Sequence, residues 1–517
     1  MVIKTVIRKG EYYDSVKLMI VSKKMAELPG ILGAAVQMGT ELNKEVLKRT
    51  GMLDQESNTA SAEDLMISVK GVSQEAVDAA LSQVDTLLNQ RSGEGNKEYR
   101  PKTIDSALRA MPGINLAIIS VPWRYAKNEA MKALQKGLHV LLFSDNVTLD
   151  EEYELKEFAR GSGLLLMGPD CGTALINNVP LGFANKVRKG KIGIVGASGT
   201  GMQEVMTLIH KQGFGISQAI GTGGRDLSVK IGGATMLHGL QALQADPETE
   251  IIVIISKPPA PQVADKILSY ISKECSKPTV VNFIGGDPKS IASSRAYPAT
   301  TLEEAALQAA ELAGRQSKQY LSHPTEDELE NIARAEAKQL NGRQKYVRGL
   351  YSGGTLCYES LLILKDWVGD VYSNTPLIKE LKLKDVSQLD GHVCLDLGDD
   401  EFTVGRPHPM IDTALREDLL ASQAGDPQVA VILLDIVTGY GTHNDPAQVF
   451  ADLVKLHKGK AEKEGRHLVV ISSVCGTEGD PQNAVVQEQR LRDAGVIVLP
   501  CNAAAARLAG KIIKYCD

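Results

Sequence analysis

The sequence predicts a multidomain α/β protein with parallel sheets, and three observations carry that prediction. The chain has 517 residues, which by the usual size of one hydrophobic core predicts about three to four domains. Short apolar runs of strand length alternate with helical stretches, as in parallel βαβ units. Two stretches in the second half of the chain also carry the same turn residues in the same order, which indicates an internal repeat.

The composition narrows the class of partner. Hydrophobic residues make up 43% and charged residues 23% of the chain, as in ordinary soluble globular proteins. The 57 basic and 63 acidic residues leave a net charge of −6, which argues against nucleic acid or an anionic membrane as the main partner. Aromatic residues are only 4%, whereas glycines number 48, so glycine turns are expected rather than a base-stacking platform.

Cysteine spacing and apolar run lengths predict a cytoplasmic protein. The seven cysteines are odd in number and none forms a C-x-x-C pair, so neither a disulfide framework nor a metal site is expected. The first residues lack the pattern of a signal peptide. The longest apolar runs, such as 251–255 and 429–434, are too short for a membrane helix.

The first element is an N-terminal α/β domain, predicted over residues 1–100. Short β-rich runs alternate in it with amphipathic stretches. The predicted strands cover residues 1–8, 31–38 and 64–69, and the predicted helices cover 13–27, 41–50 and 74–89. A polar stretch, residues 90–101, then predicts a linker.

The second domain is predicted over residues 101–188 as a set of parallel βαβ units. Its predicted strands are 116–121, 139–143 and 164–167, separated by helices at 125–136 and 151–160. Ligands bind at the carboxyl ends of such strands. Trp123, Arg124 and Lys127 follow a strand that ends at Pro122, where basic side chains meet nucleotide phosphates. The alternative, an ordinary solvated helix start, explains these residues equally well.

The third and fourth domains, predicted over 189–318 and 340–517, repeat one another. Residues 197–200 (Ala-Ser-Gly-Thr) correspond to 352–355 (Ser-Gly-Gly-Thr), and Glu204 corresponds to Glu359 at the same spacing. An Asp-Pro turn precedes the strand at 251 and again the strand at 429. A charged helical stretch, 325–339, separates the copies. We therefore predict a duplication whose two modules face each other about a pseudo-two-fold axis.

A glycine-rich turn, Gly196-Ala-Ser-Gly-Thr-Gly201, is the sharpest local signal. It joins a strand to a helix, where free N–H groups and the helix dipole attract an anion. Neither a dinucleotide fingerprint nor a P-loop lysine is present. The turn alone suits a simple N-cap equally well, but the repeat supplies a second one, and two converging helix N-termini would hold a phosphate. The predicted phosphate contacts are Ser198, Gly199, Thr200, Gly201, Gly353, Gly354 and Thr355.

A second glycine loop, residues 221–226, carries Arg225, which could clamp an oxyanion bidentately. The alternative is a surface arginine capped by Asp226. Lys257 follows a buried strand and would lie at the mouth of the sheet, although exposed lysines are common there.

An acidic loop, residues 397–412, offers groups for proton transfer or for a divalent cation. It contains Asp399, Asp400, Arg406, His408 and Asp412, with Asp435 and His443 further along the chain. A histidine between two prolines also serves often to fix a loop, and that alternative stays open.

These motifs carry a resemblance to a known family. Val121-Pro122 with Lys127, residues 168–171, Gly199-Thr200, Gly223-Gly224 and residues 246–250 resemble the α-subunit of succinyl-CoA synthetase over residues 101–315. The resemblance implies a Rossmann-like CoA-binding domain followed by a flavodoxin-like ligase module, and the fourth domain resembles the ligase module of the β-subunit. The whole chain, with motifs at 143–147, 168–173, 196–201 and 405–412, is similar to the FdrA family, whose members are usually described as acyl-CoA synthetases.

The resemblance implies ligand contacts as well as a fold. CoA, if bound, would contact Val121, Pro122, Lys127, Ser144, Asp145 and Asn146. The acyl substrate would contact Gly223, Gly224, Lys257 and Arg406.

Two departures from the synthetases change the expected chemistry. The synthetases carry a phosphoryl group on the histidine of a Gly-His-Ala-Gly motif, but residues 284–294 contain no histidine here. No covalent phosphohistidine is therefore expected. The synthetases also need an ATP-grasp domain, and nothing in this chain resembles one.

Three functions follow as hypotheses. The first is a subunit of a phosphate-dependent carbamoyl or acyl transferase of the oxamate carbamoyltransferase type, which forms carbamoyl phosphate from an N-carbamoyl amide in purine and allantoin catabolism. Arg225 would stabilise charge, and His408 or Asp400 would carry the proton. The second is an NDP-forming acyl-CoA synthetase that works with a separate ATP-grasp subunit. The third is a non-catalytic binding or regulatory scaffold. All three fit a homo- or hetero-oligomer with other subunits of an operon-encoded complex.

Overall fold

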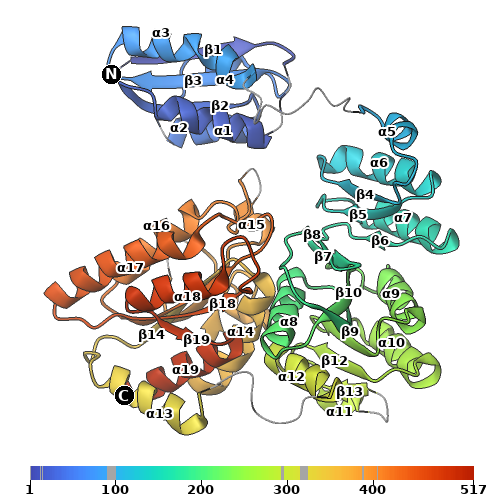
Figure 1. Cartoon of the computed structure of the whole chain (residues 1–517). Helices are drawn as coiled ribbons and strands as arrows, with labels where there is room; N and C mark the ends of the chain where they lie inside the picture. The colour runs from blue at the N-terminus through green and yellow to red at the C-terminus, as the bar shows by residue number, and fades with distance from the viewer. Residues whose placement is uncertain are drawn as a thin grey trace. The chain divides into compact units, whose positions relative to one another are not determined.

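The computed structural model describes residues 2–11, 13, 15–49, 51–89, 101–292, 296–314, 324–386, 389–403 and 406–516. The chain separates into two compact units, Met1–Arg100 and Pro101–Asp517 (Figure 1). The predicted linker at 90–100 and the loop residues 293–294 and Gly405 lie outside the described residues. The predicted multidomain α/β class with parallel sheets is confirmed. None of the described helices is long and apolar enough to cross a membrane.

The N-terminal unit is a small antiparallel sheet with helices. Its strands β1 (Val2–Arg8), β2 (Ile31–Met38) and β3 (Leu65–Gly71) pair in the order β1-β3-β2. The helices are α1 (Ser15–Ala26), α2 (Glu41–Arg49), α3 (Gln74–Ser82) and α4 (Val84–Asn89), with a 3₁₀ turn η1 (Ser57–Thr59). The single helix predicted at 74–89 is wrong, because α3 ends in a tight turn in which Gln83 N donates to Ala80 O.

The second unit begins with a short parallel sheet of three strands. The strands β4 (Leu116–Ile119), β5 (His139–Leu142) and β6 (Leu166–Met167) follow that spatial order. Helices α5 (Ile104–Ala110), α6 (Trp123–Gln135) and α7 (Leu149–Gly161) accompany them. Thr148 and Glu151 form a capping box at the start of α7. The strand predicted at 116–121 ends earlier, because Pro122 serves as the N-cap of α6.

The first of the two repeated modules has a seven-stranded sheet in the order β13-β12-β11-β9-β10-β7-β8. Its strands are β7 (Thr173–Ile176), β8 (Val179–Gly182), β9 (Lys189–Gly196), β10 (Ile216–Gly221), β11 (Ile251–Ser256), β12 (Thr279–Phe283) and β13 (Ala296–Pro298). Its helices are α8 (Gly199–Lys211), α9 (Ala234–Ala245), α10 (Pro261–Glu274), α11 (Pro288–Ile291) and α12 (Leu302–Leu312). Strands β9 to β13 are parallel, and the hairpin β7–β8 joins β10 antiparallel.

Helix α13 (Glu326–Ala337) leads to the second module, whose six parallel strands follow the order β15-β16-β14-β17-β18-β19. The strands are β14 (Tyr346–Tyr351), β15 (Val371–Tyr372), β16 (His392–Asp396), β17 (Val429–Val437), β18 (Val469–Cys475) and β19 (Ile497–Leu499). The helices are α14 (Gly354–Val368), α15 (Asp400–Thr403), α16 (Ala414–Gly425), α17 (Pro446–Lys463), α18 (Ala484–Asp493) and α19 (Asn502–Lys514), with a 3₁₀ turn η2 (Lys379–Leu381).

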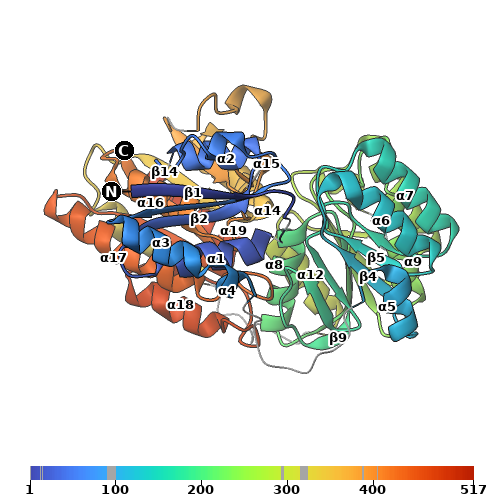
Figure 2. The ribbon, with the colours of Figure 1, turned by 90° about the horizontal axis from the view of Figure 1, so that it is seen from above.

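The two modules share one topology. The order β13-β12-β11-β9-β10 of the first matches β19-β18-β17-β14-β16 of the second, as the predicted duplication requires. In two perpendicular views, α8 and α12 of the first module face α14 and α19 of the second (Figures 1 and 2). Buried side chains of all four helices belong to one continuous hydrophobic core. The two modules are therefore packed together by a shared apolar interior.

Candidate functional site

The N-termini of α8 and α14 meet where the two modules join. Ser198 caps α8 by accepting a hydrogen bond from Gly201 N at 3.0 Å. Its hydroxyl also lies 2.5 Å from the hydroxyl of Thr355 on α14, and both side chains are buried. A Cβ at Gly201 would lie 3.0 Å from the Thr355 methyl carbon, and one at Gly353 would lie 3.0 Å from that of Thr200. The two turns singled out in the sequence are thus in reciprocal contact.

Two buried glutamates cross the same junction in opposite directions. Glu204 on α8 accepts the backbone N–H of Asn502, the first residue of α19, at 3.1 Å. Glu359 on α14 accepts the backbone N–H of Leu302, the first residue of α12, at 2.8 Å. Each module therefore supplies a carboxyl group to a helix N-terminus of the other. The side chain of Asn502 adds a 2.7 Å bond to Glu359.

Burial sets the protonation of these glutamates. The pKa of Glu359 is raised to about 7 by its complete desolvation, and the pKa of Glu204 is raised for the same reason. Sequence comparison within the chain had paired Glu204 with Glu359 as repeat partners. It gave no signal for Asn502 or Leu302, because their importance depends on the packing of the opposite module.

A carboxylate already occupies the turn that precedes α14. Asp435, in β17, accepts hydrogen bonds from Ser352 N at 2.8 Å, Ser352 Oγ at 2.9 Å and Gly353 N at 2.8 Å. Arg416 neutralises it at 2.9 Å, and the whole group is buried. The Gly353 N–H therefore donates to Asp435 in this structure, and the predicted phosphate contact at Gly353 stays a prediction.

A second carboxylate lies against the start of α14. Asp396 ends β16 and is 6% exposed, and its Oδ1 accepts Gly398 N at 3.1 Å. Its Oδ2 would lie only 2.4 Å from a Cβ at Gly354, so the absence of a side chain there lets the carboxyl approach the helix. Burial raises the pKa of Asp396 to about 6, against the opposing effect of the Lys257 ammonium.

The two copies therefore differ in charge. In the first module Gly196 pairs with Gly221 and with Ile255 across the sheet. In the second module Tyr351 pairs with Asp396, and Leu350 pairs with Leu434, the residue before Asp435. The start of α8 thus lacks the two carboxylates that surround the start of α14, and its positive dipole end is the one that suits an anion.

His408 lies close to this carboxylate pair. Its Nδ1 accepts Met410 N at 3.2 Å, and a Cβ at Gly398 would lie 2.8 Å from its Nε2. The ring is 5.5 Å from Phe183, which extends from the β7–β8 hairpin. Burial lowers the pKa of His408 to about 4, so the imidazole is neutral near pH 7. The Nδ1 atom of His408 therefore fixes the loop. The proposed catalytic role of His408 stays a prediction.

Two other residues of the acidic loop, Asp400 and Arg406, make fewer contacts than His408. Asp400 begins α15, and burial together with the charges of Asp145 and Asp399 raises its pKa. Arg406 is exposed, and its backbone N–H donates to Thr403 O. Neither residue is hydrogen-bonded to the His408 ring. Their roles stay predictions.

The second glycine loop is held by a buried charge network. Asp226 accepts the N–H groups of Thr235 and Met236 at the start of α9, at 3.0 and 2.9 Å. Lys156 neutralises Asp226 at 2.7 Å. The alternative that Asp226 caps Arg225 is wrong, because Asp226 points into this network.

Arg225 is attached to the second domain instead. One terminal nitrogen donates to Val147 O at 2.5 Å and lies 3.0 Å from the Glu152 carboxylate. Gly223 has a positive φ of 82°, and a Cβ there would lie 2.1 Å from Pro169 O, so only glycine fits. A Cβ added at Gly224 would lie 3.8 Å from Asp170 Oδ2. The oxyanion clamp by Arg225 and the substrate contacts of Gly223 and Gly224 stay predictions.

The predicted CoA contacts lie at the carboxyl ends of β4 and β5. Ser144 Oγ donates to Val121 O at 2.6 Å and accepts Val121 N at 3.0 Å, which ties the two strand ends together. Asn146 has a positive φ of 53°, and Lys127 pairs with Glu154 at 2.6 Å. The strand-to-helix turn at 120–122 contains no glycine, so these residues do not form a glycine-rich phosphate cradle. The predicted CoA contacts stay predictions.

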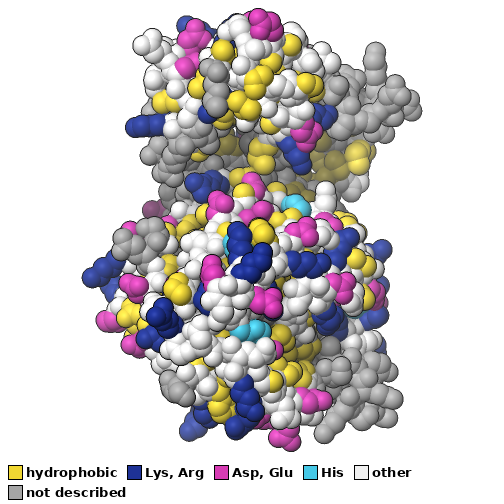
Figure 3. Space-filling view, turned by 90° about the vertical axis from the view of Figure 1, so that its left-hand side faces the viewer, with side chains coloured by type: hydrophobic (Ala, Val, Ile, Leu, Met, Phe, Trp, Pro, Cys, Tyr) yellow, Lys and Arg dark blue, Asp and Glu magenta, His cyan; other side chains and the backbone are white. Residues whose placement is uncertain are grey.

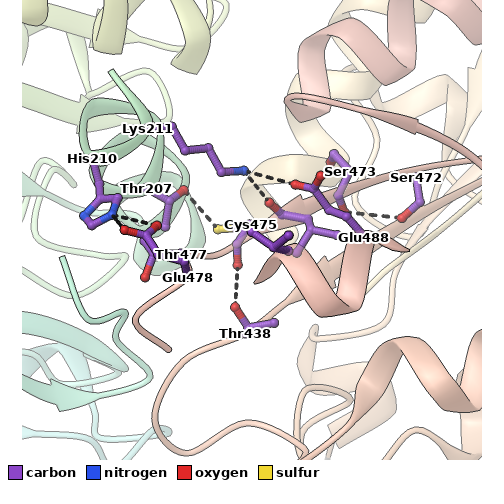
Figure 4. A network of polar contacts seen from close by, with 12 residues as sticks. Thr207, His210, Lys211, Thr438, Ser472, Ser473, Cys475, Thr477, Glu478 and Glu488 are labelled. Carbon is purple, nitrogen blue, oxygen red and sulfur yellow. Dashed lines mark hydrogen bonds and ion pairs between the residues drawn. The ribbon is translucent and has the colours of Figure 1, made fainter. Parts of the chain in front are cut away.

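The far end of α8 is bound to the second module as well (Figure 4). His210 Nε2 lies 2.8 Å from Glu478, and Lys211 Nζ donates to Val474 O at 3.0 Å. Asp480 accepts bonds from the Asn185 side chain at 2.8 Å and from Lys186 N at 2.7 Å. Helix α8 is therefore held at both ends, so its N-terminus has a fixed position relative to α14.

On the face seen in Figure 3, acidic and basic side chains are interspersed among the described residues. Within the described part of the chain, no group of histidine, cysteine and acidic residues has the geometry to hold a metal ion.

Three family models match parts of the chain. The model of the CoA-ligase family matches residues 350–512, and that of the CoA-binding domain matches residues 187–285. The latter match lies after the residues predicted to contact CoA. A third, described as the heavy metal-associated domain of AllF, matches residues 1–103.

A metal site built from thiolate or imidazole ligands does not fit the N-terminal unit. Residues 1–103 contain neither cysteine nor histidine, and methionine is their only soft ligand. Two of its carboxylates are engaged locally, Asp54 by Ser57 and Asp64 by Ser61 and Gly10. The fold of this unit is therefore retained without the donor set.

Relatives match to very different extents. YahF, an uncharacterized protein of Escherichia coli strain K12, is 45% identical over 99% of both chains. The ADP-forming sulfoacetate-CoA ligase subunit SauD of Bilophila wadsworthia is 27% identical over 33% of this chain and 59% of its own. The α-subunit of ADP-forming succinate–CoA ligase of Aquifex aeolicus is 30% identical over 34% of this chain and 57% of its own. The structure of ATP citrate lyase from Methanothrix soehngenii, with citrate and coenzyme A, aligns with a TM-score of 0.36, 18% identity and 44% of each chain.

Proposed function

The chain belongs to the FdrA family of CoA-ligase-like proteins, and from that premise we propose that it is the phosphate-binding subunit of a carbamoyl or acyl transferase. Its relatives among the ADP-forming ligases are subunits of larger enzymes. By analogy, we expect this chain to act together with other subunits, as an oxamate carbamoyltransferase-type complex that forms carbamoyl phosphate.

One observation carries the proposal: two helix N-termini meet at the module junction, and only that of α8 is free of an internal carboxylate. Ser198 and Thr355 bring the two turns within 2.5 Å of each other. An inorganic phosphate at the start of α8 would be held by backbone N–H groups in a buried, preorganised setting. The predicted contacts at Ser198, Gly199, Thr200 and Gly201 carry the proposal, because the Gly353 N–H already donates to Asp435.

The absence of histidine in residues 284–294 favours direct transfer. Without a phosphohistidine, the phosphate itself must attack the carbonyl carbon of the donor. In a carbamoyl transfer, the new bond joins phosphate oxygen to the carbamoyl carbon, and the carbon–nitrogen bond of the donor amide breaks. The phosphate loses a proton and the departing amide nitrogen gains one.

A coupled assay tests this function. The protein, with the products of neighbouring genes, is incubated with oxalurate and inorganic phosphate, and carbamoyl phosphate is measured. We expect formation that depends on both substrates. If no combination of partners forms carbamoyl phosphate, the proposal is wrong.

The matches to the CoA-ligase family and to the CoA-binding domain favour a second candidate, an NDP-forming acyl-CoA ligase that uses a separate ATP-grasp subunit. This candidate predicts micromolar CoA binding by calorimetry and labelling of the chain by [γ-³²P]ATP in the presence of that subunit. Both results together would replace the transferase proposal.

A further inference from the structure

Strand β4 is an uncovered edge of the second domain. It is the outer strand of the parallel sheet β4-β5-β6. Parallel sheets normally have both faces buried, yet Ile118 within β4 is 56% exposed. Met111 before the strand and Trp123 and Tyr125 after it are exposed as well. Large apolar side chains therefore reach the solvent before, within and after this one strand.

The outer side of β4 also presents backbone groups without a partner. Asn115 O accepts His139 N at 2.8 Å, and Ile119 O accepts Phe143 N at 2.9 Å. Residues 115, 117 and 119 therefore face β5, and the N–H and C=O groups of Leu116 and Ile118 point the other way. No turn or loop among the described residues forms a hydrogen bond with those groups. An edge of this kind accepts another strand.

Other edge strands of the molecule are protected, which sets β4 apart. On β2, Ser22 Oγ accepts Val36 N at 2.8 Å and donates to Val36 O at 3.2 Å. At the opposite edge of the same small sheet as β4, Thr235 Oγ1 donates to Leu166 O on β6 at 3.0 Å. Strands β8 and β13 each contain a proline, and β1 carries two basic residues. Prolines, charges and covering side chains are the usual protection of an edge, and β4 has none of them.

The segment around β4 carries no charge. Residues 111–123 contain no acidic residue, no basic residue and no histidine. In a strand pair with two-fold symmetry, side chains near the axis lie close to their own copies, so a charge would meet a like charge. A strand that pairs with a different partner can use opposite charges to stabilise the pair, and β4 offers none. The absence of charge therefore favours pairing of the strand with itself.

We propose that β4 pairs with β4 of a second copy of this chain, antiparallel about a two-fold axis. Leu116 and Ile118 of one copy exchange backbone hydrogen bonds with Ile118 and Leu116 of the other. Because these residues lie on one face of the strand, each exposed Ile118 side chain is covered by Leu116 of the other copy. The two small sheets become one sheet in the order β6-β5-β4-β4-β5-β6. The pairing is independent of the reaction proposed above, since it uses no residue of the phosphate site.

The mass of the full chain in solution tests this pairing. Light scattering coupled to size exclusion should give twice the chain mass of 55.6 kDa at micromolar concentration. Ile118→Lys places two ammonium groups beside the axis, so the dissociation constant of the dimer should rise at least about hundredfold. Val485→Lys is the matched control, because Val485 on α18 is 63% exposed and belongs to the second module. It should leave the mass unchanged.

Chemical cross-linking gives a second measurement that does not add a charge. Six of the seven cysteines are buried, so the background Cys516→Ser removes the remaining accessible thiol. Ile118→Cys keeps a small apolar side chain at the edge, and a short bismaleimide should join two copies through it. Val485→Cys in the same background should give no cross-linked dimer.

The results separate a β4 dimer from any other occupant of this edge. A wild-type mass of one chain would overturn the proposal. So would a dimer that Ile118→Lys leaves intact and that Ile118→Cys does not cross-link, because its interface would lie elsewhere. Circular dichroism of each variant shows that the fold is kept, and if Ile118→Lys does not fold, the cross-link of Ile118→Cys decides.

Discussion

At the residue scale, burial decides what the ionisable groups of the junction can do. Glu359 and Asp396 are both desolvated, and the pKa of each is raised, to about 7 and about 6. Asp435, by contrast, is matched by Arg416 and three hydrogen bonds to the turn before α14. One helix start thus holds a paired carboxylate with a structural role and a carboxyl group that can carry a proton.

Glu359 makes stability depend on pH. Its pKa is about 7 in the folded chain and 4.5 ordinarily, so the folded state binds more protons in between, and stability falls as pH rises from about 4.5 to 7. Between about pH 4.5 and 7, Glu359→Gln should remove up to about 3 kcal/mol of this change in the free energy of unfolding. Urea unfolding at several pH values measures it, with the exposed Glu462→Gln as control. An unchanged slope for Glu359→Gln would contradict the prediction, although Glu204 shares the direction and will leave part of the slope.

At the element scale, the sequence predicted the strand-to-helix turns better than it predicted the residues elsewhere in the chain that contact them. The strand–turn–helix at Gly196 and the repeat that pairs Glu204 with Glu359 are local patterns, and they led directly to the junction. The sequence placed Asp435 with the acidic loop, and its contact with the turn before α14 could not be predicted, because Asp435 lies far along the chain from that turn. Asn502 could not be predicted for the same reason. The separation of α3 from α4 was missed as well, since no glycine or proline marks it.

Two helical glycines, Gly201 on α8 and Gly459 on α17, offer a matched pair of substitutions. A Cβ at Gly201 would lie 2.4 Å from Ser198 Oγ and 3.0 Å from Thr355, whereas one at Gly459 on α17 meets no atom within 4 Å. Gly201→Ala should cost about 1–3 kcal/mol by overpacking and should weaken phosphate binding. Gly459→Ala should gain about 0.5–1 kcal/mol from helix propensity. Urea unfolding and phosphate calorimetry check both, and a Gly201→Ala chain as stable as the wild type would show that the turns are not in tight contact.

At the scale of the whole molecule, the chain is two compact units of unequal size. The apolar core of the second unit runs through both repeated modules. Salt bridges and hydrogen bonds also join them, from Ser198 to Asp480. The N-terminal unit has a core of its own.

Calorimetry should therefore show two transitions, a small one for residues 1–100 and a large one in which both modules unfold together. Zn²⁺ should leave the small transition unchanged, because a ligand raises stability only if the folded state binds it, and this unit lacks cysteine and histidine. A shift of several degrees with Zn²⁺ would contradict this, and so would separate transitions for the two modules.

The fusion of the two modules in one polypeptide has a consequence for how the junction could evolve. In a homodimer, every substitution at a two-fold interface occurs twice, once on each subunit. A carboxylate introduced beside one helix end would then appear beside the other and would repel an anion from both. In a single chain the copies mutate independently, so Gly221 and Ile255 could be retained in one while Asp396 and Asp435 arose in the other. Broken symmetry thus gives one interface a side with two buried carboxyl groups and a side without them.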